Sequence, residues 1–196
     1  MSNKYLETLK SIDGEVFNLS YHQQRLEGVV SSFKNDRTYN LKEILNPPKN
    51  GLYRCRVVYD EKKIDVEYIP YIKRQIKSLK LLFSDDIEYK HKYANREDLN
   101  KLFSLRAECD DILIVKSGLI RDTSIANIAF FDGAQWVTPK RPLLKGTMRE
   151  KCIHDKKIFE EDIFVEDLKK FSKVALMNAM IDFDIIAQDN IEEIIC

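Results

Sequence analysis

The chain has 196 residues, of which 44% are hydrophobic and 33% are charged. This mixture can fill a core and still cover a well-solvated surface, which excludes a chain that is disordered throughout. Lysine plus arginine and aspartate plus glutamate number 32 each, so the formal net charge of zero excludes a general attraction to nucleic acid or to an anionic membrane surface.

The sequence predicts a cytoplasmic protein with free thiols and without a metal site. The first residues are too polar for the hydrophobic part of a signal peptide, and no apolar run approaches the roughly 20 residues that cross a bilayer. The cysteines form no C-x-x-C pair, so the spacing of a zinc site is missing. The four cysteines are Cys55, Cys109, Cys152 and Cys196.

The first thirty residues predict a β-hairpin followed by a helix. Residues 5–12 and 15–18 have the composition of short strands on either side of Asp13-Gly14, a dipeptide typical of tight hairpin turns. Ser20 opens an S-x-x-Q pattern, in which the serine side chain caps a helix and the glutamine reaches back to it. We therefore expect a helix over residues 21–33 with one apolar face.

A second hairpin and a connection follow. Residues 52–59 and 63–68 alternate between apolar and polar types, which predicts two antiparallel strands. Residues 70–77 are the best candidate for a connection between two halves of the chain. We therefore expect an N-terminal α/β subdomain over residues 1–76 and a C-terminal subdomain over residues 77–196.

The C-terminal half is expected to consist mainly of strands. Helices are predicted over residues 95–105 and 164–171, and Thr147 opens a second capping box with Glu150. The predicted strands cover residues 79–83, 112–115, 128–131, 136–138, 173–177 and 184–188. Because the helices are scattered among strands without a regular β-α-β series, we expect a mixed α/β fold of the α+β type.

Two basic segments contain side chains that suit a phosphorylated aldehyde. Arg25 lies in the predicted first helix, where its planar fork could bind a phosphate or could pair with Glu27 at the surface. Lys92 lies in the basic stretch 89–96, whose neighbouring cations could depress the pKa of its amine and so favour imine formation. The alternative for this stretch is a solvated basic surface.

A third segment combines an acid with a turn that can bind an anion. Asp122 lies in a Ser/Thr-rich turn between predicted strands, where a carboxylate could hold a proton on a pyridine nitrogen or could simply form the turn. The N–H groups at the helix start after Gly146 form a ready anion site, and Thr147 could also be an ordinary helix cap.

Together and in this order, these motifs resemble the class IV aminotransferase family, whose members carry pyridoxal 5'-phosphate (PLP) in the fold of D-amino acid aminotransferase. The family pattern begins with H-x-x-R-L, here residues 22–26, and continues with a lysine, here Lys92. An acidic residue five positions before an asparagine comes next, here Asp122 and Asn127. The pattern ends with T-P…L-x-G-x-x-R, here residues 138–149.

The resemblance implies roles for individual residues. Lys92 matches the lysine that forms a Schiff base with the cofactor, and Lys90 is a rival two positions earlier. Arg25 matches the arginine that binds the cofactor phosphate. Asp122 stands where the family usually has a glutamate beside the pyridine nitrogen, so its reach is one methylene shorter. The other expected cofactor-binding residues are Thr123, Ser124, Gly146, Thr147, Met148, Asn178 and Ala179.

The resemblance also implies two small subdomains with the cofactor between them, and a homodimer as the habitual assembly. Residues 77–196 are then the PLP-binding subdomain, and residues 1–76 are a short version of the N-terminal one. Typical members have strands before the segment that matches residues 5–9, and those strands usually contribute to the substrate pocket and the dimer contact. Their absence weakens any transfer of substrate specificity.

Two arginines and two short segments bear on the reaction. Arg54 and Arg56 share a face of one predicted strand, so either could bind a substrate carboxylate, and an exposed strand face is the alternative. Residues 92–96 resemble the K-x-x-N-R segment of aminodeoxychorismate lyases, and residues 177–181 resemble their C-N-A-L-M segment, with Met177 in place of the cysteine. We therefore expect a lyase-like PLP enzyme that acts on an amino acid or an aminodeoxychorismate-like substrate. The alternatives are a D-amino acid or branched-chain aminotransferase and a non-catalytic PLP-binding protein.

Overall fold

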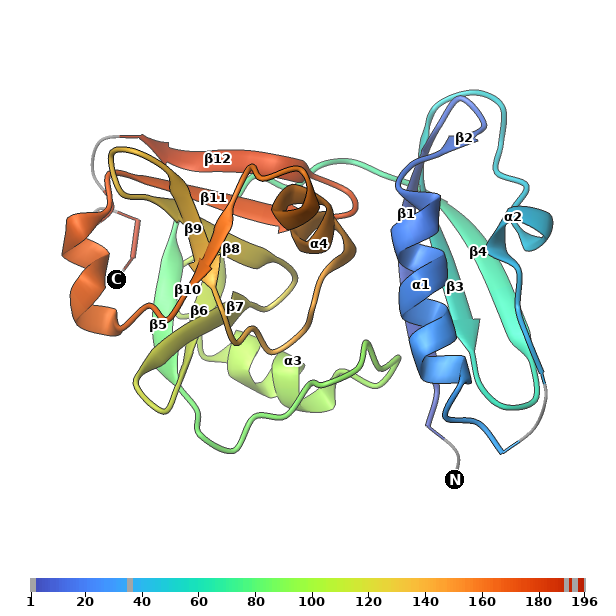
Figure 1. Cartoon of the computed structure of the whole chain (residues 1–196), viewed down its shortest axis with the longest axis horizontal. Coiled ribbons are helices and arrows are strands. Elements are labelled where there is room, and N and C mark those ends of the chain that lie inside the picture. The colour runs from blue at the N-terminus through green and yellow to red at the C-terminus, as the bar shows by residue number, and fades with distance from the viewer. Residues whose placement is uncertain (1–2, 35–36, 189–190, 192–193, 196) are drawn as a thin grey trace. The chain divides into compact units, whose positions relative to one another are not determined.

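The computed structural model describes residues 3–34, 37–188, 191 and 194–195. The chain divides into two compact units (Figure 1). The first unit comprises residues 1–73 and 91–95, and the second unit comprises residues 74–90 and 96–196. Three sheets and a few helices make up the two units, so the fold is mixed α/β, as the strand-rich sequence predicts. The predicted division into subdomains of residues 1–76 and 77–196 stays a prediction.

A four-stranded antiparallel sheet and one main helix form the first unit. Its elements are β1 (Tyr5–Ile12), β2 (Glu15–Val16), α1 (Leu19–Val30), α2 (Leu41–Ile44), β3 (Leu52–Tyr59) and β4 (Ile64–Pro70). The strand order is β2-β1-β3-β4, and β1 pairs with β3 along its whole length. Figure 1 shows α1 lying along this sheet.

Alternation along the strands builds the core of the first unit. Leu9 of β1, Val57 of β3 and Leu26 of α1 are fully buried and belong to one apolar cluster. Successive side chains of a strand point to opposite faces. Arg54 and Arg56, which alternate with the buried positions of β3, therefore lie on the face of the sheet away from this cluster.

Both predicted hairpins are confirmed, but the cap predicted for the first helix is wrong. Helix α1 begins at Leu19, so Ser20 lies inside its first turn. The N-cap is Asn18, whose φ of 53° is left-handed and whose side chain makes no capping hydrogen bond. Asparagine tolerates this conformation better than most residues, which explains why the helix can start without a capping box.

The second unit contains two sheets. Its elements are β5 (Leu79–Phe83), α3 (Glu97–Ser104), β6 (Asp111–Lys116), β7 (Leu119–Thr123), β8 (Asn127–Phe131), β9 (Trp136–Pro139), α4 (Thr147–His154), β10 (Phe159–Glu161), the 3-10 helix η1 (Val165–Lys170), β11 (Lys173–Asn178) and β12 (Asp182–Gln188). The sheet orders are β5-β6-β7 and β10-β9-β8-β11-β12. Leu113 and Ile120 from the first of these sheets share one core with Phe130 and Leu176 from the other.

Strand β7 and the start of α4 differ from the sequence predictions. All five residues of β7 are buried, yet Arg121 and Asp122 interrupt its apolar pattern, so the strand was not predicted. The expectation that Asp122 lies in a turn is therefore wrong. The capping box predicted at Thr147 is also wrong, because Thr147 is the first residue of α4 and Gly146 is its N-cap.

The cysteines that the structure describes are buried free thiols. They are Cys55, Cys109 and Cys152. Cys196 lies outside the described residues. In the described part of the chain, no helix is both long enough and apolar enough to cross a membrane.

Candidate active site

In the first unit, Arg25 is bound by a buried carboxylate. Arg25 Nε donates to Oε1 of Glu7 at 2.8 Å, and Arg25 Nη2 donates to Oε2 at 2.6 Å. His22 Nδ1 lies 2.6 Å from the same Oε2. The side chain of Glu7 is 1% exposed, that of His22 is fully buried and that of Arg25 is 18% exposed. Arg25 therefore pairs with Glu7 on β1, 18 residues away in the sequence.

The charges around this cluster fix its protonation. Burial raises the pKa of Glu7, but the charge of Arg25 and the hydrogen bonds from His22 and Arg25 outweigh it and lower the pKa to about 2. Burial lowers the pKa of His22 by more than Glu7 raises it. An ionised carboxylate only accepts hydrogen bonds. Neutral His22 must then carry its proton on Nδ1, which leaves a lone pair on Nε2.

Lys92 lies on a short extended segment that pairs with the start of β1. The backbone N–H of Leu6 donates to the Lys92 carbonyl at 2.8 Å, and the N–H of Ala94 donates to the Lys4 carbonyl at 2.8 Å. These two bonds hold the backbone on either side of Tyr93, which directly follows the lysine. The position of Lys92 is thereby set by a strand and not by a free loop.

The structure places Lys92 in the same unit as the Arg25 cluster. Lys92 is half-buried, whereas the rival Lys90 is exposed. Burial is the main cause of the lowered pKa of His22, and the positive charges of Arg25 and Lys92 lower it further. The amine of Lys92 is thus close enough to His22 to influence its protonation.

In the second unit, Asp122 is a buried carboxyl group with both oxygens bound. Asn127 Nδ2 donates to Oδ1 at 2.7 Å, and the backbone N–H of Leu144 donates to Oδ2 at 2.9 Å. Burial raises the pKa of Asp122 to about 6, although these hydrogen bonds and the charge of Arg149 act in the opposite direction. A carboxyl group with this pKa can hold or release a proton near neutral pH.

Asn127 connects Asp122 to the start of α4. Its Nδ2 also donates to the Leu144 carbonyl at 2.8 Å, so both of its amide protons are used. A Cβ on Gly146 would stand 2.0 Å from Oδ1 of Asn127, which is far inside any allowed contact. The φ of Gly146 is −75°, which suits any residue, so the backbone conformation does not demand glycine. Glycine is required because a Cβ would come too close to Asn127.

The first turn of α4 is the helix start that the sequence predicts as an anion site. The first N–H groups of a helix have no acceptor within the helix, and Gly146 has no side chain that could cap them. Thr147 and Met148 occupy this turn and are buried. Arg149 follows, is 1% exposed, and donates from Nη2 to the Pro139 carbonyl at 2.9 Å. Arg149 also pairs with Glu160 at 2.6 Å, which ties the turn to β10.

The other expected cofactor-binding residues gather around the turn after β7. Thr123 Oγ1 donates to the carbonyl of Ala126 at 3.1 Å and accepts from its N–H at 3.0 Å. Arg96 Nη2 donates to the Ser124 carbonyl at 2.5 Å. Both contacts fix the backbone of the turn.

Asn178, at the end of β11, contacts the same turn. Its Nδ2 donates to the carbonyl of Ile125 at 3.3 Å. Ala179 begins the turn that joins β11 to β12. The structure therefore brings Asn178 together with Thr123 and Ser124 within the second unit.

The two arginines expected to bind substrate differ in their surroundings. Arg56 Nη1 lies 3.8 Å from Glu67 Oε2 across the β3–β4 pair, and both side chains are exposed. Arg54 Nε is buried and has no hydrogen-bond partner among the described residues. An unpaired buried donor costs free energy, so Arg54 is the better candidate for binding an external carboxylate.

The sequence pattern of the family described as "Amino-transferase class IV" matches residues 84–187. That range is 104 of the 196 residues, more than half of the chain. The chain belongs to the class IV aminotransferase family. Members of this family generally use PLP.

Two relatives from the curated proteins cover nearly the whole chain. An uncharacterized protein of Haemophilus influenzae is 37% identical over 180 residues, which cover 89% of this chain and 96% of the relative. A Schizosaccharomyces pombe protein named "Putative aminodeoxychorismate lyase" is 26% identical over 200 residues, which cover 91% of this chain and 86% of the relative.

Two solved structures have the same fold. The crystal structure of a "putative 4-amino-4-deoxychorismate lyase" from Haemophilus somnus 129PT has a TM-score of 0.85 at 35% identity, and the match covers 92% of this chain and 97% of that one. A "hypothetical aminotransferase" from Mycobacterium tuberculosis, with α-ketoglutarate and PMP bound, has a TM-score of 0.75 at 14% identity. This match covers 94% of this chain and 80% of that one. At that identity the second likeness concerns the fold alone.

The residues of this family member fit the parts of PLP. Arg25 and the first-turn amides of α4 are donors that suit a phosphate group. Asp122 is a buried acid whose pKa of about 6 suits contact with a pyridine nitrogen. Lys92 is a half-buried amine held by β1.

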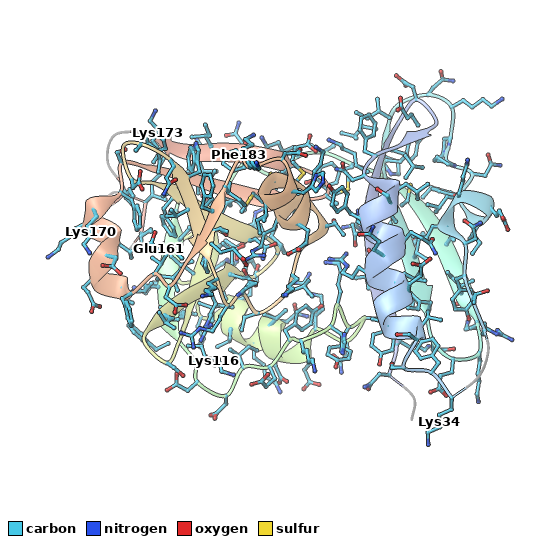
Figure 2. The ribbon with its side chains drawn as sticks, viewed as in Figure 1. Lys34, Lys116, Glu161, Lys170, Lys173 and Phe183 are labelled. Carbon is cyan, nitrogen blue, oxygen red and sulfur yellow. The ribbon has the colours of Figure 1, made fainter. Side chains whose placement is uncertain are left out.

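A hollow elsewhere in the second unit does not involve the family motif. Its volume is about 420 Å³, and its walls are Asp132, Ala134, Glu161, Asp167, Lys170 and Phe171. Figure 2 shows Glu161 and Lys170 at the side of the unit that carries η1, whereas α4 lies at the other side (Figure 1). The chemistry of the family is therefore not assigned to this hollow.

Sequence reasoning gave no role to Glu7 and used Asn127 only as a motif position. The signal for Glu7 was present, because it alternates with Tyr5 and Leu9 on the strand face that forms the core. A charged residue at such a position needs a buried partner. No comparable signal exists for the contact between Asn127 and Gly146, which are 19 residues apart.

Proposed function

We propose that this chain is a PLP-dependent enzyme with an aminodeoxychorismate lyase-like reaction, in which Lys92 bonds to the cofactor. The proposal rests mainly on Asn127, which connects the buried carboxyl group of Asp122 to the N-terminus of α4. Asp122 and the first turn of α4 thus supply, in one unit, a group that can hold a proton and a group that can bind phosphate.

Each residue has a role at a stated atom. When bound, PLP would supply an electron sink for the reacting Cα of an amino substrate. Lys92 Nζ, as a neutral amine, would take the proton from that Cα. Asp122 would hold a proton at the pyridine nitrogen, and a cationic N–H beside it would favour its ionised form. Arg25, together with the amides of Thr147 and Met148, would bind the phosphate.

The setting of Lys92 supports it as the anchor. Lys92 is half-buried on a segment that pairs with the start of β1. The exposure of Lys90 argues in the same direction.

The lyase reaction is favoured over transamination by two observations. Residues 92–96 and 177–181 resemble segments of aminodeoxychorismate lyases. The relatives at 26% and 35% identity carry lyase names. Arg54, with its unpaired buried Nε, would bind a carboxylate of the substrate, and Arg56 is the weaker candidate because Glu67 already faces it.

The deciding experiment is an assay of the purified protein loaded with PLP. We expect release of pyruvate from aminodeoxychorismate without any amino acceptor. Formation of keto acid from D-amino acids or branched-chain amino acids, without pyruvate release, would establish the aminotransferase alternative. Inactivity in both assays with cofactor bound would establish a non-catalytic binding protein. A homodimer and a cytoplasmic location also stay expectations, testable by sedimentation and by cell fractionation.

A further inference from the structure

We propose that Glu7 is a positioning residue that holds the guanidinium of Arg25 in place for a phosphate, an inference that rests on the proposed function. Glu7 stands on β1 among apolar neighbours, with its side chain 1% exposed. Burial of a charge is costly unless it is paired and hydrogen-bonded.

The contact between Glu7 and Arg25 fixes an orientation and not merely a distance. Two parallel bonds, Nε to Oε1 at 2.8 Å and Nη2 to Oε2 at 2.6 Å, place both groups in one plane. His22 binds the same carboxylate from the same helix at 2.6 Å. Glu7 itself cannot shift along the sheet, because it is opposite Val57 in a continuous eight-residue pairing.

This arrangement orders Arg25 in advance. A free arginine side chain loses much rotamer freedom when it binds a ligand, and that loss weakens binding. Glu7 occupies the Nε–Nη2 edge of the guanidinium and so sets the plane in which Arg25 meets a ligand. Glu7 would thus strengthen phosphate binding without touching the cofactor.

The change that tests this is Glu7→Asp. Aspartate keeps the negative charge, so its long-range repulsion of a phosphate is unchanged, but one methylene less breaks the two-bond contact. The matched control is Glu27→Asp, at an exposed position of α1 that binds Gln23. The full-length protein, stripped of cofactor, is titrated with PLP and with pyridoxal, which lacks the phosphate.

The expected result is a fall in PLP affinity of about three- to tenfold for Glu7→Asp, with pyridoxal affinity unchanged. Glu27→Asp should match the wild type with both compounds. Equal loss of both affinities would show that Glu7 only supports the fold of the first unit, and no loss of either would show that Arg25 needs no support. Both results overturn the inference while the proposed function stands.

Two further outcomes are distinguishable. If wild-type protein binds no PLP, the proposed function fails and the inference falls with it. If Glu7→Asp does not fold, Glu7→Gln replaces it, because the amide keeps the length of the side chain but has only one acceptor oxygen for Arg25. A lower ratio of PLP affinity to pyridoxal affinity in Glu7→Gln then supports the inference, and an unchanged ratio overturns it.

Discussion

Replacing Gly146 with alanine is expected to break the link between Asp122 and α4. The new Cβ would lie 2.0 Å from Oδ1 of Asn127, which is 1.4 Å closer than the 3.4 Å at which ordinary contact begins. Alanine adopts the backbone angles of Gly146, φ −75° and ψ 144°, without strain. The cost of the substitution therefore arises from the displacement of Asn127.

The magnitude follows from the hydrogen bonds that Asn127 makes. A displacement of this size breaks its bonds to the Asp122 carboxylate and to the Leu144 carbonyl, now 2.7 and 2.8 Å long. A bond to a charged group contributes about 1.5–3 kcal/mol and a neutral one about 0.5–1.5 kcal/mol. We expect Gly146→Ala to lower the free energy of unfolding by about 2–4 kcal/mol.

The assay is urea unfolding followed by tryptophan fluorescence. Trp136 is the single tryptophan and lies on β9, so the signal reports the second unit. The matched control is the Asn127→Ala variant, in which the clash no longer exists. Adding Gly146→Ala to this variant should lower its free energy of unfolding by little more. The expected clash is refuted if Gly146→Ala lowers the free energy of unfolding by less than about 0.5 kcal/mol. It is also refuted if Gly146→Ala lowers that free energy equally in the Asn127→Ala background.

Three further predictions concern the cofactor and pH. Lys92→Ala should abolish PLP that borohydride can fix to the protein, and Lys90→Ala should leave it intact; the reverse pattern would move the anchor to Lys90. Arg25→Ala should weaken PLP binding about ten- to hundredfold in a titration, because charge-assisted hydrogen bonds are lost. Unchanged affinity would leave Arg25 as a structural partner of Glu7. Burial raises the pKa of Asp122 from 3.8 to about 6, so the folded cofactor-free protein binds more protons than the unfolded chain between these values. The contribution of Asp122 to stability is therefore complete below pH 3.8 and is lost as the pH rises through about 6, by about 3 kcal/mol in total. Urea unfolding from pH 4 to 7 should show this loss in the wild type relative to Asp122→Asn, and identical pH profiles would contradict it.

The parts of the fold with strong local signals could be predicted from the sequence. Asp13-Gly14 marks the first hairpin turn, and the alternation along residues 52–59 marks β3. Strand β7 has no such signal, because Arg121 and Asp122 are both buried in its middle. Their burial depends on partners far along the chain, such as the carbonyl of Arg141 that binds Arg121 at 2.5 Å.

In the candidate site too, the motif residues could be predicted from local sequence, but the residues that orient them could not. The motif predicted Lys92, Arg25 and Asp122 as candidates, since residue type and spacing are local properties. The groups that orient them are distant in sequence, with Glu7 18 residues from Arg25 and Leu144 22 residues from Asp122. Such contacts depend on sheet register and chain crossing, which no periodicity in one sequence reveals.

The pairing of residues 91–95 with β1 has a consequence for dissecting the molecule. This segment belongs to the first unit, although the chain on both sides of it belongs to the second. A gene fragment that ends at residue 73 would encode a sheet whose β1 edge lacks the bonds at Lys4 and Leu6. Bare edges of this kind invite aggregation. The lysine and the sheet it completes must therefore be expressed and engineered as one piece, and a graft of the first unit onto another scaffold has to carry both.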